Sequence, residues 1–266
     1  MIVQAHGGEA LEEILLDRAV QARLKQEGIA LEQSQIDAER QRVLAALATD
    51  PDQAARLMKE MRAQRGLDDV RFGNLLRRNA GLRTLVSDKI TINEAATRQA
   101  YQLRYGDRYQ VRLITSGSLD QLTRARRLAV DSATFTKLAI EISTDRSMQQ
   151  GGLLSPVSPA DPTYPKAIRD ALPKLKVDNT ASRLSPIIAL DQGYALLWLE
   201  EVIKQADPPG IEQVRDELAA AVRDDLESVR MRQLARTLIE QTNVVVLDPA
   251  LDKSWRQQFD SLQAPE

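Results

Sequence analysis

The sequence has no cysteine and only one histidine, His6, among its 266 residues. The absence of cysteine excludes disulfides, thiolate nucleophiles, and zinc or iron–sulfur centres held by cysteine. A single histidine near the N-terminus also excludes a Ser-His-Asp triad or a multi-histidine metal site elsewhere in the chain. We therefore expect no metal site and no cofactor, which leaves carboxylate, lysine, tyrosine, serine and threonine side chains for any chemistry.

Long apolar runs and an excess of one charge are missing too. The richest apolar stretches, 194–199 and 244–247, have the length of strands, far below the roughly 20 residues of a membrane span. Met1 is followed by neither a basic region nor an apolar stretch, so we expect no membrane span and no signal peptide in this chain. Lys plus Arg (36) nearly balances Asp plus Glu (38), and the net charge of −2 favours neither nucleic acid nor anionic lipid as a partner.

Aromatic residues make up only 4% of the chain, beside 43% hydrophobic and 28% charged residues. This composition is typical of a folded globular protein rather than a disordered one. A core made mostly of Leu, Ile, Val and Ala suits helices better than sandwiches or barrels. We expect a helix-dominated protein with one large domain or two small ones.

Apolar residues at helical spacing occupy the first 106 residues. They predict helices over 9–27, 34–49, 51–66, 67–86 and 91–106, with Gly81 as a break in the fourth. Residue types at the helix ends support these limits. The end signals are Gly28, Ser34 with Asp37, Asp50-Pro51, Gly66, Thr91 with Glu94, and Gly106.

A different pattern begins at residue 109, where alternation predicts a first strand over 109–114. Helical spacing returns over 119–130 and 135–142, and the Gly- and Pro-rich stretch 151–173 predicts a loop with short helices at most. Two apolar strands, 186–190 and 194–199, are joined by Asp191-Gln192-Gly193. This three-residue hairpin loop places Gly193 where a positive φ is needed.

The C-terminal part begins with a linker over 207–210 and a helix predicted to reach residue 241. Its stripe of apolar residues needs a partner surface, which the N-terminal helices can supply, so we expect a discontinuous helical domain. Residues 244–247 predict a short strand or extended segment, and Asp248-Pro249 begins a last helix. The apolar stripe of the long helix consists of Ile211, Val214, Leu218, Val222, Leu226 and Val229.

Five short motifs follow one another in the middle of the chain. They are Tyr109-Gln110-Val111-Arg112-Leu113-Ile114, Phe135-Thr136-Lys137-Leu138-Ala139, Ser143-Thr144-Asp145, Gly151-Gly152-Leu153-Leu154 and Gly193-Tyr194. In order and spacing, residues 109–202 resemble a parvulin-type (PpiC, rotamase) peptidyl-prolyl isomerase domain. The flanking helices resemble the SurA and PrsA class of extracytoplasmic foldases, in which a helical chaperone domain is interrupted by a parvulin module.

The resemblance implies an α+β fold in which a parvulin-like domain of antiparallel sheet and helices is inserted into a discontinuous all-α chaperone domain. We expect the N-terminal helical chaperone domain over 1–106 and the parvulin-like domain over 107–206. Residues 207–266 then form the long helix and a short helix that pack back on the N-terminal domain.

Both histidine positions of the parvulin pattern hold apolar residues here. Leu113 stands at the first and Ala195 at the second, and Leu190 stands where a Thr or Ser often occurs near the second. Asp145 fits a position that holds Cys or Asp in the family, so it is the one candidate catalytic residue. Its alternative role is to accept hydrogen bonds from backbone amides in the turn over 143–147. We expect Leu113 and Ala195 to pack in the core.

The candidates for peptide binding are apolar or amphipathic. The resemblance places Leu154 and Tyr164 near a pocket for a proline ring, with Tyr164 close to the position of its aromatic wall. Met58 and Met61, three residues apart on a predicted helix, either line an adaptable groove or pack in the core.

The resemblance to this foldase class implies an extracytoplasmic, for example periplasmic, chaperone that binds unfolded or nascent polypeptides, and the missing histidines lead us to expect a degenerate, inactive isomerase domain. Prolyl isomerisation must lower a rotational barrier of about 18–20 kcal/mol, and the side chains of Leu113 and Ala195 cannot hydrogen-bond to a substrate amide. Two alternatives stay open. One is an active atypical isomerase that uses Asp145 with the pocket around Leu154 and Tyr164. The other is a structural scaffold in which the long C-terminal helix forms a homodimer.

Overall fold

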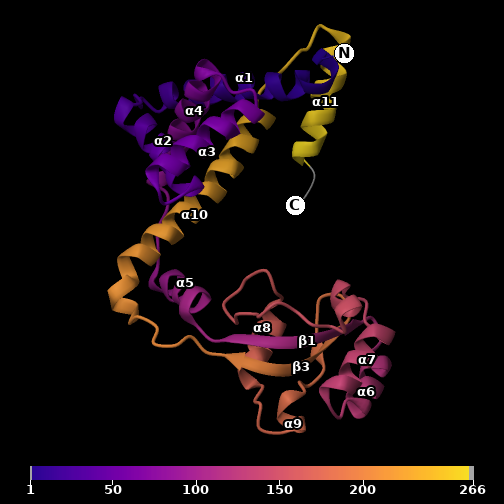
Figure 1. The fold of residues 1–266 in the computed structure, drawn as a ribbon. Coiled ribbons are helices and arrows are strands. Elements are labelled where there is room, and N and C mark those ends of the chain that lie inside the picture. The colour runs from indigo at the N-terminus through magenta and orange to yellow at the C-terminus, as the bar shows by residue number, and fades with distance from the viewer. Residues whose placement is uncertain (1, 264–266) are drawn as a thin grey trace. The chain divides into compact units, whose positions relative to one another are not determined.

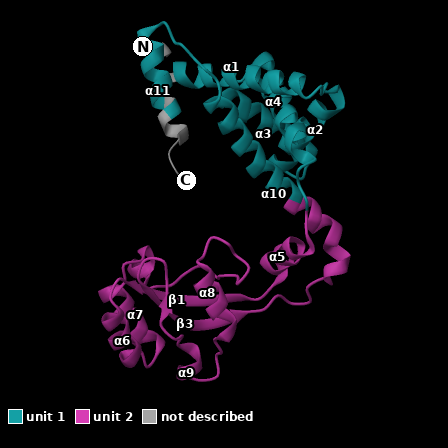
Figure 2. Cartoon of the chain, turned by 180° about the vertical axis from the view of Figure 1, so that it is seen from behind, with its two compact units in different colours: residues 1–91, 223–266 teal, residues 92–222 magenta. Residues whose placement is uncertain are grey.

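A computed structural model describes residues 2–263 and divides into two compact units (Figure 2). Unit 1 combines residues 1–91 with 223–266, and unit 2 comprises residues 92–222. Unit 1 is helical and is built from both ends of the sequence, while unit 2 contains the antiparallel sheet. The predicted fold class, an α+β protein with a discontinuous helical part, is thus confirmed, whereas the domain limits at 106 and 206 stay a prediction.

Unit 1 contains four N-terminal helices and the C-terminal helices (Figure 1). Its core joins Val20 and Leu24 of the first helix, Leu82 and Leu85 of the fourth, and Leu238 of the long helix. The C-terminal part of the long helix therefore packs on the N-terminal helices, as its apolar residues predicted. The helices are α1 (Ile2–Gln26), α2 (Gln33–Leu47), α3 (Pro51–Gln64), α4 (Asp69–Ser87), the part of α10 (Ile211–Glu240) from residue 223 on, and α11 (Pro249–Gln263).

The core-facing side of α10 differs from the predicted stripe. Leu226 and Val229 are 37% and 41% exposed, while Glu227 between them is buried. Met231 and Leu234 then pack on the core, four and seven residues after Glu227. The stripe shifts because a buried carboxylate, rather than an apolar side chain, faces the other helices at this level.

Glu227 belongs to a buried ion cluster that connects three helices. The Arg83 guanidinium of α4 donates hydrogen bonds to Glu39 of α2 and to Glu227 of α10. Ser87 Oγ donates to Glu227 Oε1 at 3.1 Å, and Arg42 Nη1 donates to Glu39 Oε1 at 3.1 Å. Burial opposes the charge of Arg83, but the hydrogen bonds from its guanidinium to Glu39 and Glu227 outweigh burial and raise its pKa. The cluster ties the returning helix α10 to the N-terminal helices.

The break predicted at Gly81 is wrong, because α4 runs unbroken from Asp69 to Ser87. A Cβ at Gly81 would lie 2.7 Å from Val20 Cγ1 and 3.0 Å from Leu24 Cδ1 of α1. Glycine stands here because two helices approach each other closely, a reason that the local sequence does not reveal.

Helix caps agree with the sequence in part. Asp50 caps α3 as predicted, with its Oδ1 accepting from Gln53 N at 2.7 Å. The start of α2 is capped by Glu32, whose N–H donates to the Gln35 side chain at 2.9 Å, and not by Ser34. α5 (Glu94–Tyr105) is capped by Asn93 rather than by Thr91. In both corrected cases a neighbouring side chain within two residues takes the capping position, which propensity alone does not resolve.

Unit 2 is built on a three-stranded antiparallel sheet of order β1-β3-β2. β1 (Arg108–Ser116) pairs along its length with β3 (Tyr194–Ile203), and β2 (Ile188–Ala189) pairs with the start of β3. Gly193 has φ +86°, which confirms the predicted hairpin loop. β2 is shorter than the predicted strand 186–190, since Pro186 has no N–H for a sheet hydrogen bond.

Helices cover both faces of this sheet (Figure 1). On one face α6 (Leu119–Leu128) and α7 (Ser132–Ile142) pack on Ile114, Leu196 and Trp198. On the other face α8 (Lys166–Ala171) and the 3-10 turn η2 (Leu172–Lys174) contribute Ile168 and Leu172 to the second core. The stretch 151–173 is a loop with short helices, as predicted; η1 (Arg146–Gln150) precedes it and α9 (Thr180–Arg183) follows it.

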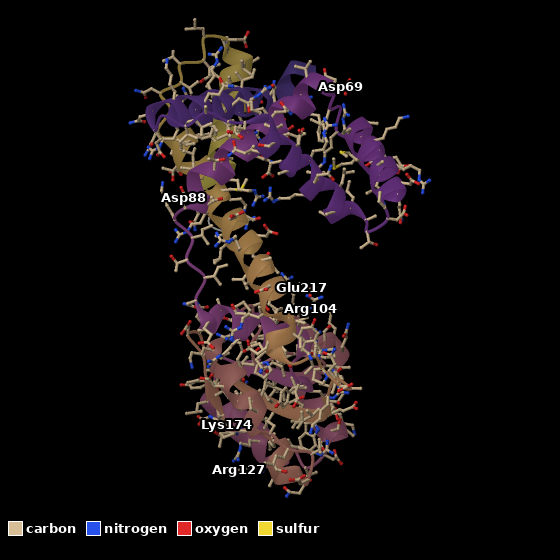
Figure 3. The ribbon with its side chains drawn as sticks, turned by 90° about the vertical axis from the view of Figure 1, so that its left-hand side faces the viewer. Asp69, Asp88, Arg104, Arg127, Lys174 and Glu217 are labelled. Atoms are coloured by element: carbon tan, nitrogen blue, oxygen red, sulfur yellow. The ribbon has the colours of Figure 1, made fainter. Side chains whose placement is uncertain are left out.

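Unit 2 also includes α5 and the beginning of α10. Tyr101 Oη donates to the Pro209 carbonyl at 2.8 Å, and Arg104 Nη1 lies 2.6 Å from Glu217 Oε1. Figure 3 labels this Arg104–Glu217 ion pair. After α10, residues 244–247 form no strand and leave Val245 and Leu247 83% and 90% exposed.

Candidate functional site

The two residues that the parvulin resemblance places at the histidine positions lie in the centre of the sheet. Leu113 pairs with Leu197, and Ala195 pairs with Thr115 on one side and Ile188 on the other. Leu113 is 4% exposed and Ala195 0%, and both belong to the same apolar cluster on the α8 face of the sheet. These two side chains pack in the core and offer no polar atom to a bound peptide.

The two pocket candidates, Leu154 and Tyr164, and the third degenerate position, Leu190, lie around this same cluster. Leu154, Tyr164 and Leu190 are partly buried and pack against it from three separate segments of unit 2. Leu154 reaches its place because its N–H donates to the Val111 carbonyl of β1 at 3.0 Å. The structure therefore brings together five positions that are up to 82 residues apart, from 113 to 195, at one face of one sheet.

Two glycines allow the chain to cross between β1 and α7 before it reaches Leu154. Gly151 and Gly152 have φ +62° and +77°. A Cβ on Gly152 would lie 2.5 Å from the Leu113 carbonyl oxygen, and Gly152 O accepts a hydrogen bond of 2.7 Å from Leu113 N. The Gly-Gly motif is thus explained by close backbone packing against Leu113.

Asp145 caps the turn that follows α7. Its Oδ1 accepts from Ser147 N at 2.8 Å, while its own N–H donates to Ser143 Oγ at 3.3 Å. Ser143 Oγ also accepts from Thr115 N at 3.1 Å, which connects the turn to the end of β1. Asp145 therefore performs the local backbone role that was weighed against a catalytic one.

The phenol of Tyr164 adds a polar group beside the apolar cluster. Burial raises the pKa of the Tyr164 phenol, and the carboxylates of Asp161 and Asp145 raise it further. Ser147 Oγ is buried and finds no hydrogen-bond partner in the described part of the chain. Unit 2 contains no imidazole, because the only histidine of the chain is residue 6.

Met58 and Met61 lie in the other unit, on α3. Both are half-buried on one side of this helix, so they fit either a core or a groove role. Unit 1 leaves several apolar residues exposed, which include Ile14 (51%), Val70 (71%) and, from the predicted stripe of the long helix, Val229 (41%). Only the packing of neighbouring helices decides which apolar residues remain outside, so no local pattern could have identified them.

Grooves accompany two of these exposed residues. Val229 borders a cavity of about 520 Å³ between α1 and α10, and Ile14 borders two cavities of about 260 and 380 Å³ between α1 and α4. Such semi-open grooves between helices can accept side chains of another polypeptide.

Residues 2–263 contain no group of three or more His, Cys, Asp or Glu side chains placed to hold a metal ion. None of their helices combines the length and the apolar character that crossing a bilayer requires.

Comparison with known proteins gives one curated sequence relative, and no protein-family model matches the chain. The relative is foldase protein PrsA 1 of Lactiplantibacillus plantarum, with 26% identity over 195 residues, or 70% of this chain and 62% of that protein. The chain thus spans less than two thirds of the relative's length.

Solved structures that align include PrsA of Bacillus anthracis, at 17% identity over 90% of this chain and 100% of that one, with a TM-score of 0.49. PrsA of Streptococcus pneumoniae aligns at 17% identity over 96% and 92%, with a TM-score of 0.40. One of two SurA-like chaperones of Campylobacter jejuni aligns at 17% identity over 82% and 97%, with a TM-score of 0.33. The sequence match agrees with the motifs and their flanks: this chain is a distant relative of the foldase PrsA.

Proposed function

We propose that this chain is an extracytoplasmic chaperone that binds unfolded or nascent polypeptides and whose parvulin-like unit lacks isomerase activity. The observation that carries the proposal is the filled sheet face, where Leu113 and Ala195 occupy the two histidine positions and are buried. The relationship to a foldase supports the chaperone part, since the chain shares its sequence pattern over 195 residues.

The loss of isomerase activity follows from the chemistry of this face. An isomerase must stabilise the twisted amide more strongly than the planar one, which requires polar groups aimed at the amide. Leu113 and Ala195 supply none, and the carboxylate of Asp145 already accepts a backbone hydrogen bond in its own turn. What remains is an apolar surface that can contact a side chain without changing the barrier to rotation.

Polypeptide binding is supported by the apolar surface of unit 1. Ile14, Val70 and Val229 are exposed on three helices, and grooves lie beside two of them. Shielding exposed apolar segments of a client from one another is enough to slow its aggregation. No bound nucleotide or metal is needed for such passive holding.

The test of the proposal is suppression of aggregation. A chemically unfolded client is diluted into buffer with increasing amounts of the purified full chain, and light scattering is followed. We expect scattering to fall as the ratio of chain to client approaches one. Unchanged scattering at a several-fold excess, together with no binding to the unfolded client in a pull-down, would refute the proposal.

An atypical isomerase is the second candidate, favoured by one observation: Leu154 and Tyr164 pack beside the apolar cluster that contains Leu113 and Ala195. In that case, substituting Asp145 by Ala should abolish catalysis of X-Pro isomerisation in a short peptide. A homodimeric scaffold built on α10 is the third candidate, and a monomeric mass by light scattering would exclude it.

A further inference from the structure

A groove runs between α1 and α4 of unit 1, where each helix presents one stripe of residues. Two cavities of about 260 and 380 Å³ form it, and they adjoin because they share four lining residues. The stripe on α1 recurs every three to four positions, as one face of a helix requires. The shared lining residues are Ile14 and Asp17 of α1 with Asn74 and Arg78 of α4.

The floor of the groove is apolar and its centre is open. Val20 and Leu24 at the floor are buried, and Leu31 and Leu75 are half-buried. Ile14 lines both cavities and is nevertheless 51% exposed. An aliphatic side chain from another polypeptide could therefore cover Ile14 and remove apolar surface from water on both partners.

The edges of the groove carry more positive than negative charge. Glu13 pairs with Arg71 at 3.0 Å, and Asp17 pairs with Arg78 at 2.9 Å. Burial raises the pKa of the Asp17 carboxyl even though Arg78 and Arg77 lower it. Both acidic groups are thus already matched by arginines of α4.

Two further arginines at the groove have no carboxylate of their own. Arg77 reaches Asn74 Oδ1 at 3.4 Å, and neither it nor Arg18 forms an ion pair within the described residues. Both side chains are exposed. The groove therefore has two guanidinium groups that form no ion pair within the described residues, although the whole chain has a net charge of −2.

We propose that the α1–α4 groove is a client-binding site that selects extended segments in which a bulky aliphatic residue is flanked by Asp or Glu. The aliphatic side chain lies on Ile14 above the apolar floor, and the flanking carboxylates pair with Arg18 and Arg77. Charge complementarity of this kind contributes more to specificity for a segment than to the affinity with which the segment binds. This inference rests on the proposed function, because it assigns the clients of the chaperone a chemistry and a place.

The test uses three labelled peptides and fluorescence anisotropy with the full chain. The first has Leu and Ile in the centre and Glu on both sides, the second has Lys in place of Glu, and the third has Ser in place of the aliphatic residues. We expect the Glu-flanked peptide to bind about tenfold more tightly than the Lys-flanked one, a difference of about 1.4 kcal/mol. This preference should shrink at high salt, because exposed charges are screened. The Ser peptide should bind weakly in all cases.

Variants connect this preference to the groove. R18E/R77E should abolish the preference for the Glu-flanked over the Lys-flanked peptide. I14S should weaken the binding of both of these peptides by about the same factor. The matched control is R127E, an exposed arginine of α6 in unit 2 (Figure 3) that forms no ion pair in the described part of the chain. The neutral variant R18Q/R77Q, with circular dichroism, keeps the test valid if the charge reversal unfolds unit 1.

The results also separate this inference from the proposed function. If wild-type protein suppresses aggregation but R18Q/R77Q and I14S bind all peptides as wild type does, the chaperone proposal stands and the groove assignment is overturned. If the variants alter peptide preference while wild-type protein fails to suppress aggregation, the groove assignment stands and the chaperone proposal falls. Self-association that disappears in the same variants would assign the groove to a second copy of the chain and overturn the inference.

Discussion

Substituting Arg83 by Met tests the link between the returning helix α10 and the N-terminal helices. The Arg83 side chain is 14% exposed, and those of Glu39 and Glu227 are each 5% exposed. Removing the guanidinium leaves two buried carboxylates without their main partner. Breaking a buried pair in this way destabilises a protein by about 3–5 kcal/mol. A chain of this size then loses roughly 6–20 °C of melting temperature, at about 2–4 °C per kcal/mol.

The two tryptophans allow this loss to be assigned to one unit. Trp255 lies on α11 in unit 1 and Trp198 on β3 in unit 2. Single-tryptophan versions, made with Phe at the other position, report each unit separately during thermal unfolding. We expect Arg83→Met to lower the transition seen by Trp255 and to leave that seen by Trp198 in place.

The matched control is Arg42→Met, since Arg42 contacts the same Glu39 but its side chain is 43% exposed. An exposed ion pair contributes about 1 kcal/mol or less, so this variant should melt near the wild type. The reasoning is refuted if Arg83→Met costs no more than Arg42→Met, or if only the transition of unit 2 moves.

Three further predictions concern the sheet face. Asp145→Ala removes a cap and should cost about 1 kcal/mol in the free energy of unfolding of unit 2, while suppression of aggregation stays at the wild-type level. Gly152→Ala should destabilise unit 2 by more than 1 kcal/mol because φ is +77° and the added Cβ meets the Leu113 carbonyl, whereas Gly117→Ala, with open space around it, should be near neutral in the same denaturation assay. The pKa of the Tyr164 phenol is raised in the folded state above its ordinary value of about 10. The free energy of unfolding of unit 2 should therefore fall as the pH rises from about 10 through the pKa of the folded state. Asp145→Asn should lower that pKa in an ultraviolet titration, and an unchanged value would contradict the assigned neighbourhood.

Local signals predicted the elements of the fold well. Asp50 before a proline at the start of α3 and Gly193 in the hairpin loop each act through their own backbone, so their neighbours in sequence suffice to predict them. Gly81 illustrates the opposite case. Its small size serves the contact with Val20 on another helix, and a local rule misread it as a break.

The candidate functional residues also separate into those that the sequence predicted and those that it did not. The resemblance to the parvulin pattern pointed to Leu113, Leu154, Tyr164 and Ala195. The structure brings these four residues to one face of the sheet. The α1–α4 groove was not predicted, because the exposure of Ile14 depends on the spacing of two packed helices.

The ion cluster of unit 1 was not predicted either. Arg83 and Glu227 are 144 positions apart, and no periodicity in one sequence pairs residues at that distance. The shifted face of α10 follows from the same pair, since Glu227 takes the place that an apolar residue was expected to hold. Features that depend on two distant segments therefore required the structure.

The central claim is that unit 2 has the fold of a parvulin-type isomerase domain but no isomerase activity, while the full chain binds unfolded polypeptides. The most direct measurement is a protease-free assay of X-Pro isomerisation in a short peptide, run beside aggregation suppression with the same preparation of the full chain. The account predicts isomerisation at the uncatalysed rate together with clear suppression of aggregation. Catalysis above background that disappears in Asp145→Ala would contradict it, because the apolar face of Leu113 and Ala195 would then support turnover without any imidazole.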